Sequence, residues 1–191
     1  MKILISACLL GLPCRYDGAS KPQLWVEELA RRHELIPMCP EQMGGLPTPR
    51  NPSERRGDRV VMRTGEDVTE QYRRGAACAL RLYQLLGCKA AVLKERSPSC
   101  GCGAVYDGTF TGTLTAGDGV TAALLLGTNW TEQQLLDYYG DTEYPPFKKD
   151  QTVTLAARPL DEASLEALSE AGQREAGQEY WFVYLYSAPQ G

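Results

Sequence analysis

The chain has 191 residues, 43% of them hydrophobic, and a formal net charge of −4, which is enough for one domain with its own core. This acidic balance disfavours binding to nucleic acids and to anionic membranes, which require basic surfaces. Seven cysteines, an odd number, and no export signal favour metal or redox chemistry over a secreted disulfide framework. No apolar run is long enough to span a membrane, so we expect a cytoplasmic protein.

The first part of the chain alternates strands with helices. Residues 2–7 form an apolar, β-branched run that ends in a Gly/Pro-rich loop, which predicts a strand with Cys8 at its carboxyl end. Apolar residues at helical spacing predict a helix over residues 22–32. Residues 34–38 predict a second strand. That strand runs directly into Cys39.

The same alternation continues toward the middle of the chain. Residues 59–63 predict an edge strand, and residues 69–86 predict the longest helix, with a threonine cap. Residues 89–94 predict a third strand, followed by the loop that contains Cys100 and Cys102. Such alternation is typical of parallel sheets, which bind ligands at the carboxyl ends of their strands. We therefore expect the three cysteine loops to converge at one edge of the sheet.

The rest of the chain has weaker patterns. Residues 105–113 predict a small hairpin and residues 120–126 a core helix. Four further elements are predicted beyond them, namely helices over residues 131–139 and 161–173, a linker at 144–146 and a strand over 180–186. The fold class is therefore α/β with a mainly parallel sheet over residues 1–143, followed by a short α+β extension over residues 144–191.

Cys8, Cys39 and Cys100 are the candidate metal ligands, because each follows a predicted strand. A 4Fe-4S cluster held by three cysteines keeps one iron open to act as a Lewis acid. Spacing alone does not choose between zinc and iron. It also leaves a structural role open, because a free cysteine is often a small buried apolar residue. Cys78 and Cys88, in or beside a predicted helix, fit that structural role.

Other uses of these cysteines agree less well with the sequence. The Cys100-Gly101-Cys102 segment lacks the Cys-x-x-Cys spacing of thioredoxin-like proteins, and a structural zinc site would use two closely spaced pairs. A cysteine protease needs a histidine base, and the single histidine, His33, is expected to cap a helix C-terminus. Cys14 and Cys102 lie in glycine-rich loops beside candidate ligands, where either could be a spare thiol.

A carboxylate and two hydroxyls accompany the candidate ligands. Glu41 lies two residues after Cys39, and Ser97 and Ser99 precede Cys100. These groups could transfer protons or orient a molecule bound beside the metal. They could equally be ordinary loop groups that bond to the backbone.

Several sequence blocks occur together in an order that is typical of one family. They are SACLLG at 6–11 with RYDG at 15–18, CPE at 39–41 with GGLPTPR at 44–50, LKERSPSCG at 93–101 and GVTAAL at 119–124. Over about residues 1–127 the chain resembles the thiouracil desulfurase family, long catalogued as domain of unknown function 523.

The resemblance implies a Rossmann-like, three-layer domain with a 4Fe-4S cluster on Cys8, Cys39 and Cys100. It implies a non-redox reaction on 2-thiouracil or a related thiolated pyrimidine. The substrate sulfur binds the open iron, which suits a soft ligand, water replaces the sulfur on the ring, and sulfide leaves.

The resemblance also assigns roles to the polar residues. Proton transfer and substrate placement fall on Glu41 and Ser97, with Ser99 as a neighbouring substrate-binding residue. The extra thiols of Cys14 and Cys102 raise the question whether the fourth iron is open or bound to a thiolate.

Two rival functions use the same three cysteines. A non-catalytic iron–sulfur or metal-binding protein would carry sulfide or iron, but it would need no proton donor. A tRNA thiolation partner is disfavoured by the acidic charge and by the lack of an aromatic, basic RNA platform.

The basic loop with Arg50, Arg55 and Arg56 is expected to be a solvated face.

Overall fold

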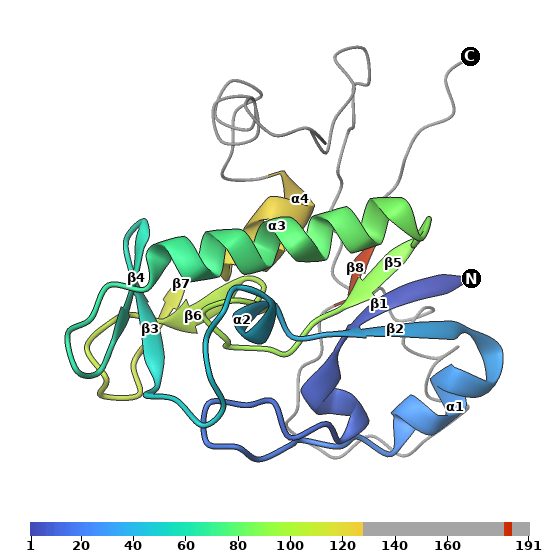
Figure 1. The fold of residues 1–191 in the computed structure, drawn as a ribbon, viewed down its shortest axis with the longest axis horizontal. Helices are drawn as coiled ribbons and strands as arrows, with labels where there is room; N and C mark the ends of the chain where they lie inside the picture. The colour runs from blue at the N-terminus through green and yellow to red at the C-terminus, as the bar shows by residue number, and fades with distance from the viewer. Residues whose placement is uncertain (128–181, 185–191) are drawn as a thin grey trace, which may run out of the picture.

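The computed structural model describes residues 1–127 and the strand at 182–184. At its centre is a four-stranded sheet in the order β2-β1-β5-β8 (Figure 1). Strands β1 (Lys2–Ser6), β2 (Glu34–Met38) and β5 (Ala90–Val92) are parallel, and β8 (Phe182–Tyr184) is antiparallel to β5. The predicted α/β class with a parallel sheet is confirmed, whereas the Rossmann-like assignment stays a prediction.

Helices cover both faces of this sheet. They are η1 (Ala7–Leu10), α1 (Trp25–Arg32), α2 (Pro40–Met43), α3 (Thr69–Leu85) and α4 (Val120–Leu126). Successive side chains of a strand point to opposite faces, and Leu4 of β1 packs in one cluster with α3 and α4, whereas Ile3 and Ile5 pack with α1. Figure 1 shows α3 and α1 on opposite sides of the sheet. The result is a three-layer arrangement.

Most predicted elements are present, with some shifted bounds. The strand at 34–38 and the helix at 120–126 have the predicted limits, whereas the third strand is shorter than predicted.

The predicted threonine cap of α3 was wrong. Val68 is the N-cap residue, and the hydroxyl of Thr69 instead bonds to Asp67 and accepts the Val60 N–H at 2.9 Å.

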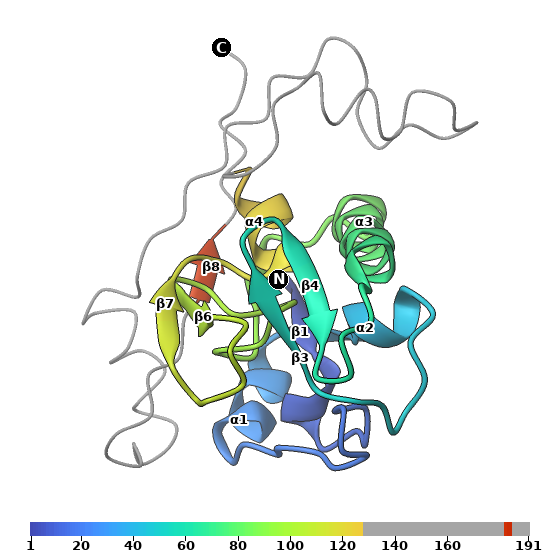
Figure 2. The ribbon, with the colours of Figure 1, turned by 90° about the vertical axis from the view of Figure 1, so that its left-hand side faces the viewer.

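Two hairpin ladders lie apart from the main sheet. They are β3 (Ser53–Arg56) with β4 (Arg59–Met62), and β6 (Ala104–Tyr106) with β7 (Leu114–Ala116). The strand predicted at 59–63 therefore pairs within a hairpin and not at the edge of the main sheet, and most of the segment predicted as a hairpin at 105–113 is the loop that joins β6 to β7. Figure 2 shows the two hairpins beside each other, and β3 contacts β6.

The C-terminal predictions fall mostly outside the described residues. This applies to the helices at 131–139 and 161–173 and to the linker at 144–146. The strand predicted at 180–186 contains β8. The division into residues 1–143 and 144–191 stays a prediction.

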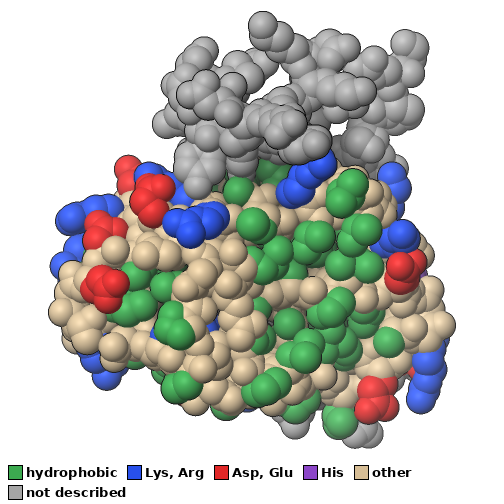
Figure 3. Space-filling model, viewed as in Figure 1, with side chains coloured by type: hydrophobic (Ala, Val, Ile, Leu, Met, Phe, Trp, Pro, Cys, Tyr) green, Lys and Arg blue, Asp and Glu red, His purple; other side chains and the backbone are tan. Residues whose placement is uncertain are grey.

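The described surface carries charged side chains of both signs. Figure 3 shows charged side chains of both signs toward the two ends of one face, with apolar side chains between them. No continuous basic stripe crosses the described part of this face. Among the described residues, no helix combines the length and apolar character needed to cross a membrane.

Two glycines allow α2 to lie directly against α3. A Cβ on Gly44 would meet the backbone carbonyl of Gln71, and a Cβ on Gly75 would meet the carbonyl of Pro40. Any side chain at either position would push the two helices apart. Because Cys39 is the N-cap residue of α2, this close packing fixes the position of Cys39.

We expect Gly75→Ala to destabilise the protein by about 1–3 kcal/mol, the usual cost of overpacking. Because the methyl group would displace α2, the variant should also retain less iron than the wild type. Urea unfolding and iron analysis under anaerobic conditions measure both effects. Arg81→Ala, on the exposed side of α3, is the control and should change stability by less than about 0.5 kcal/mol. Wild-type stability of Gly75→Ala would show that the contact between α2 and α3 is not a constraint.

Candidate functional site

The carboxyl ends of β1, β2 and β5 lead to one cavity of about 440 Å³. Cys8 lies in η1 directly after β1, Cys39 follows β2, and Cys100 lies in the loop after β5. All three line the cavity. The structure thus brings the three cysteine loops together, as the parallel topology predicts.

Cys14 is a fourth cysteine in the cavity wall. Its thiol is hydrogen-bonded to the thiols of Cys8 and Cys39, and the Cys39 Sγ lies 3.6 Å from the Cys14 carbonyl oxygen. The sequence placed Cys14 only near a candidate ligand. The fold places it among the thiols themselves, whereas Cys102, the other spare thiol, is not part of the wall.

Burial and crowding keep the thiols of Cys14, Cys39 and Cys100 neutral in the protein alone. Burial raises the pKa of Cys100 to about 12, despite side-chain hydrogen bonds from two serines. For Cys14, the hydrogen bond with Cys39 lowers the pKa, but the hydrogen bond with Cys8 and burial outweigh it and raise the value to about 11. The pKa of Cys39 is also raised, first by its hydrogen bond with Cys14 and then by burial. A bound cationic metal would reverse this balance, because a coordinating thiol is deprotonated.

The donor set fits an iron–sulfur cluster. Thiolates are the soft ligands that such clusters use. Within residues 1–127, no three His, Cys, Asp or Glu side chains are placed to hold one metal ion together. In a cluster each thiolate binds its own iron. Cys8, Cys39 and Cys100, which line one cavity from three loops, therefore suit a cluster.

The carboxylate of Glu41 lies in the cavity wall and is held by Arg50. Its Oε2 accepts a hydrogen bond from Arg50 Nε at 2.8 Å and forms an ion pair with Nη2 at 2.6 Å. The side chain of Arg50 is 3% exposed and that of Glu41 14% exposed. The expectation that Arg50 belongs to a solvated basic face was wrong, because the ion pair with Glu41 holds it inside the protein.

Arg50 also connects two of the cysteine loops. Its Nη2 donates to the Cys14 carbonyl oxygen at 3.1 Å, and its backbone N–H donates to the Tyr16 carbonyl oxygen at 2.7 Å. The loop after Cys8 is thereby fixed to the segment that follows α2. A single buried side chain thus positions both a carboxylate and a cysteine loop.

Tyr72 supports Glu41 from α3. It is 1% exposed, and its hydroxyl is hydrogen-bonded to Glu41. Burial, and then the charge of Glu41, raise the pKa of Tyr72 well above its ordinary value. The phenol is therefore a neutral hydroxyl beside the carboxylate.

The two predicted serines lie in different surroundings. Ser97 lines the cavity, and its Oγ accepts the backbone N–H groups of Ser99 and Cys100, both at 3.1 Å. Ser99 is 1% exposed and is not part of the cavity wall. Its hydroxyl bonds to Thr121 Oγ1 at 2.9 Å, which ties the cysteine loop to α4.

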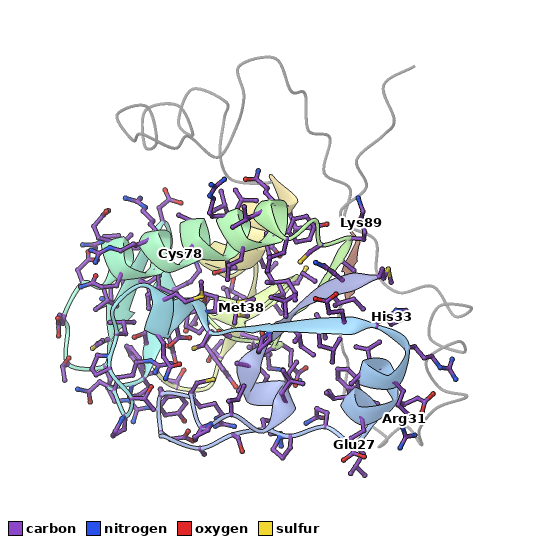
Figure 4. The ribbon with its side chains drawn as sticks, turned by 45° about the vertical axis from the view of Figure 1, so that its right-hand side comes forward. Glu27, Arg31, His33, Met38, Cys78 and Lys89 are labelled. Carbon is purple, nitrogen blue, oxygen red and sulfur yellow. The ribbon has the colours of Figure 1, made fainter. Side chains whose placement is uncertain are left out.

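The histidine lies away from the cysteines. His33 is the C-cap residue of α1, as predicted, and its backbone N–H donates to the Leu29 carbonyl oxygen. Figure 4 shows it in the turn before β2, whereas Met38 marks the opposite end of that strand. Since Cys39 follows Met38, the length of the strand separates His33 from the nearest candidate ligand.

Comparison with known proteins identifies the family. The family model for 2-thiouracil desulfurase matches residues 3–132. The chain belongs to the 2-thiouracil desulfurase family.

Two relatives of this family are similar over most of their own length. YbbK of Bacillus subtilis (strain 168), described as an uncharacterized protein, is 43% identical over 133 residues, which are 64% of this chain and 88% of YbbK. A solved structure described as the [4Fe-4S]-dependent thiouracil desulfidase TudS is 51% identical. The match has a TM-score of 0.61 and covers 64% of this chain and 83% of the TudS chain.

The cavity wall contains three polar residues that were not predicted from the sequence as site residues. They are Arg50, Tyr72 and Lys94. Arg50 ends one of the sequence blocks that carried the resemblance, so position within a block was an available signal. No sequence pattern marked Tyr72, because it reads as one apolar position of a helix.

We expect Arg50→Met to lower the free energy of unfolding by about 3–5 kcal/mol, because it leaves the Glu41 carboxylate buried without its partner. Arg73→Met is the matched control, because Arg73 pairs with Glu70 on the exposed face of α3, and should cost less than about 1 kcal/mol. Urea unfolding of both variants makes the comparison. An equal loss of unfolding free energy in the two variants would mean that burial does not make the Arg50–Glu41 pair more important for stability than an exposed pair.

Proposed function

We propose that this protein is a cluster-dependent desulfurase that acts on 2-thiouracil or a related thiolated pyrimidine. The observation that carries the proposal is the single cavity that joins three cysteine loops to the Glu41 carboxylate in a member of the 2-thiouracil desulfurase family. A cysteine site without a proton-transfer group would suit a carrier equally well. Glu41 favours the enzyme.

The proposed reaction is hydrolytic and balances without an electron donor or acceptor. The oxygen of water bonds to the ring carbon, the carbon–sulfur bond breaks, and sulfur leaves as sulfide. Uracil and 2-thiouracil carry the same number of hydrogens, so both protons of water end on the leaving sulfur as hydrogen sulfide, or one stays on its anion and one passes to solvent. A group that moves protons is therefore needed beside the ring carbon.

Cys8, Cys39 and Cys100 would hold the 4Fe-4S cluster. When bound, the cluster supplies an open iron that acts as a Lewis acid toward a soft sulfur atom. The chain contributes three thiols that must lose their protons on binding. Because the protein alone raises the pKa of Cys39 and Cys100, cluster binding should weaken as the pH falls.

Glu41 would move the protons. Arg50 and Tyr72 fix its carboxylate in the cavity wall, where it can accept a proton from the attacking water and return one to the leaving sulfide. Fixing the carboxylate in advance avoids the loss of side-chain freedom during the reaction. The ion pair is therefore part of the proposed catalytic arrangement.

Ser97 would contact the substrate directly. A hydroxyl has two acceptor lone pairs and one donor hydrogen, and the Oγ of Ser97 already accepts two backbone N–H groups. Its O–H is thus left to donate, for example to a ring carbonyl or nitrogen in the cavity. The substrate-binding role of Ser99 stays a prediction, and its bond to Thr121 gives it a supporting position behind Ser97.

The cluster ligands are tested by single serine substitutions. We expect Cys8→Ser, Cys39→Ser and Cys100→Ser each to lose most iron and acid-labile sulfide after anaerobic purification, because oxygen replaces a soft ligand. Cys78→Ser, outside the cavity, is the control and should keep wild-type iron. Cys14→Ser should also keep it. If Cys14→Ser loses iron while the serine variant of Cys8, Cys39 or Cys100 keeps it, Cys14 replaces that cysteine as the cluster ligand.

The reaction is tested with anaerobic holoprotein and 2-thiouracil, by measuring sulfide release. We expect Glu41→Gln to lower kcat by about 10²- to 10⁴-fold, the usual contribution of a general acid–base group, while iron content stays at the wild-type level. Glu70→Gln, on the exposed face of α3, should leave kcat unchanged. An iron-loaded wild type that releases no sulfide would instead favour a non-catalytic cluster protein.

A further inference from the structure

Two strained residues lie in the cavity wall. Among the described residues, Arg96 and Phe110 are the non-glycine residues with a left-handed backbone, at φ of 57° and 59°. Both line the cavity. Residues with a Cβ disfavour this conformation, and such strain persists only where the surrounding structure enforces it, commonly at ligand sites. The conformation of Phe110, whose side chain is large and apolar, therefore calls for a reason.

A buried carboxylate enforces the conformation of Phe110. Oε2 of Glu54, in β3, accepts the backbone N–H of Phe110 at 2.8 Å and that of Gly108 at 3.0 Å. Glu54 is 8% exposed. A Cβ on Gly108 would lie 2.8 Å from the Arg55 carbonyl oxygen, so the loop between β6 and β7 is pressed against β3. These contacts fix the loop that carries Phe110 at the cavity.

Phe110 contributes an aromatic side chain to the cavity wall. The Arg63 guanidinium lies 5.5 Å from the centroid of its ring, and Arg63 also lines the cavity. Planar heteroaromatic rings stack on aromatic rings and on guanidinium groups. Tyr72, by contrast, is 1% exposed and hydrogen-bonded to Glu41, and Tyr16 is exposed and lies beside Arg15.

We propose that Phe110, together with Arg63, is the stacking surface that binds the pyrimidine ring in this cavity. This inference rests on the proposed function and names a specificity-determining residue for it. The ring of Phe110 orients the planar substrate, and Glu54 holds Phe110 in place through the backbone. Cyclic, planar thiocarbonyl compounds are thereby favoured over small open-chain ones.

The test compares anaerobic holoenzymes that carry Phe110→Asn or Phe110→Tyr with the wild type. Asparagine tolerates the left-handed backbone but removes the ring, and tyrosine keeps the ring. Two constants are measured, the KM for 2-thiouracil and the inhibition constant for uracil. Uracil has no sulfur atom, so it reports binding of the ring separately from binding of sulfur to iron.

We expect Phe110→Asn to raise both constants about 5- to 150-fold, the range of base stacking on an aromatic side chain. The iron content and Tm should stay close to those of the wild type, and Phe110→Tyr should keep both constants near their wild-type values. Leu114→Asn, an exposed apolar residue of β7 outside the cavity wall, is the matched control and should change neither constant. If Phe110→Asn does not fold, Phe110→Leu removes the planar ring and is measured in the same way.

Three results would overturn the inference. Unchanged constants in the ring-less variant, with an active wild type, would remove the stacking role and leave the proposed function intact. Equal losses of Tm and iron in Phe110→Asn and Phe110→Tyr would show that the residue only supports the loop. An iron-loaded wild type that releases no sulfide from 2-thiouracil would overturn the proposed function, and this inference with it.

Discussion

The parallel pairing of β1 with β2 on one side and β5 on the other is the constraint on which the rest of the molecule depends. All three strands run in the same direction, so their carboxyl ends meet at one edge of the sheet. Ser6, the last residue of β1, reinforces this edge, because its Oγ accepts the Lys94 N–H at 2.9 Å. Each strand then delivers its cysteine to the same cavity, although Cys8, Cys39 and Cys100 are far apart in sequence.

The cavity formed at this edge contains buried thiols and a buried ion pair, and each of these groups helps to hold the others in position. Neutral, buried thiols lie beside an ion pair of Glu41 with Arg50 that is itself almost inaccessible to water. Arg50 joins the Cys14 loop to the carboxylate, and the glycine contacts between α2 and α3 fix Cys39. Elsewhere in the cavity wall, Glu54 holds a strained loop. Polar groups in this site therefore position other groups as well as being available for chemistry.

The sequence patterns located regular elements better than irregular ones. The core helix at 120–126 and the strand at 34–38 had clear apolar periodicity, and the structure has them with the same bounds. The hairpin predicted at 105–113 has its strands farther out, at 104–106 and 114–116, because the threonines and Phe110 of residues 107–113 resemble a strand but form the loop. The threonine cap failed because Asp67, two residues earlier, uses the Thr69 hydroxyl and N–H.

The sequence by itself determined the α/β class and which cysteines follow strands, because hydrophobic period and glycine-rich loops are local properties. Together with the family resemblance, it also indicated the cluster and the reaction. Only the tertiary structure decided that Cys14 joins the other thiols, that Arg50 is buried against Glu41, that Ser97 and not Ser99 reaches the cavity, and that Phe110 is held there by Glu54. These facts depend on contacts between segments that are far apart in the chain, and no local pattern records such contacts.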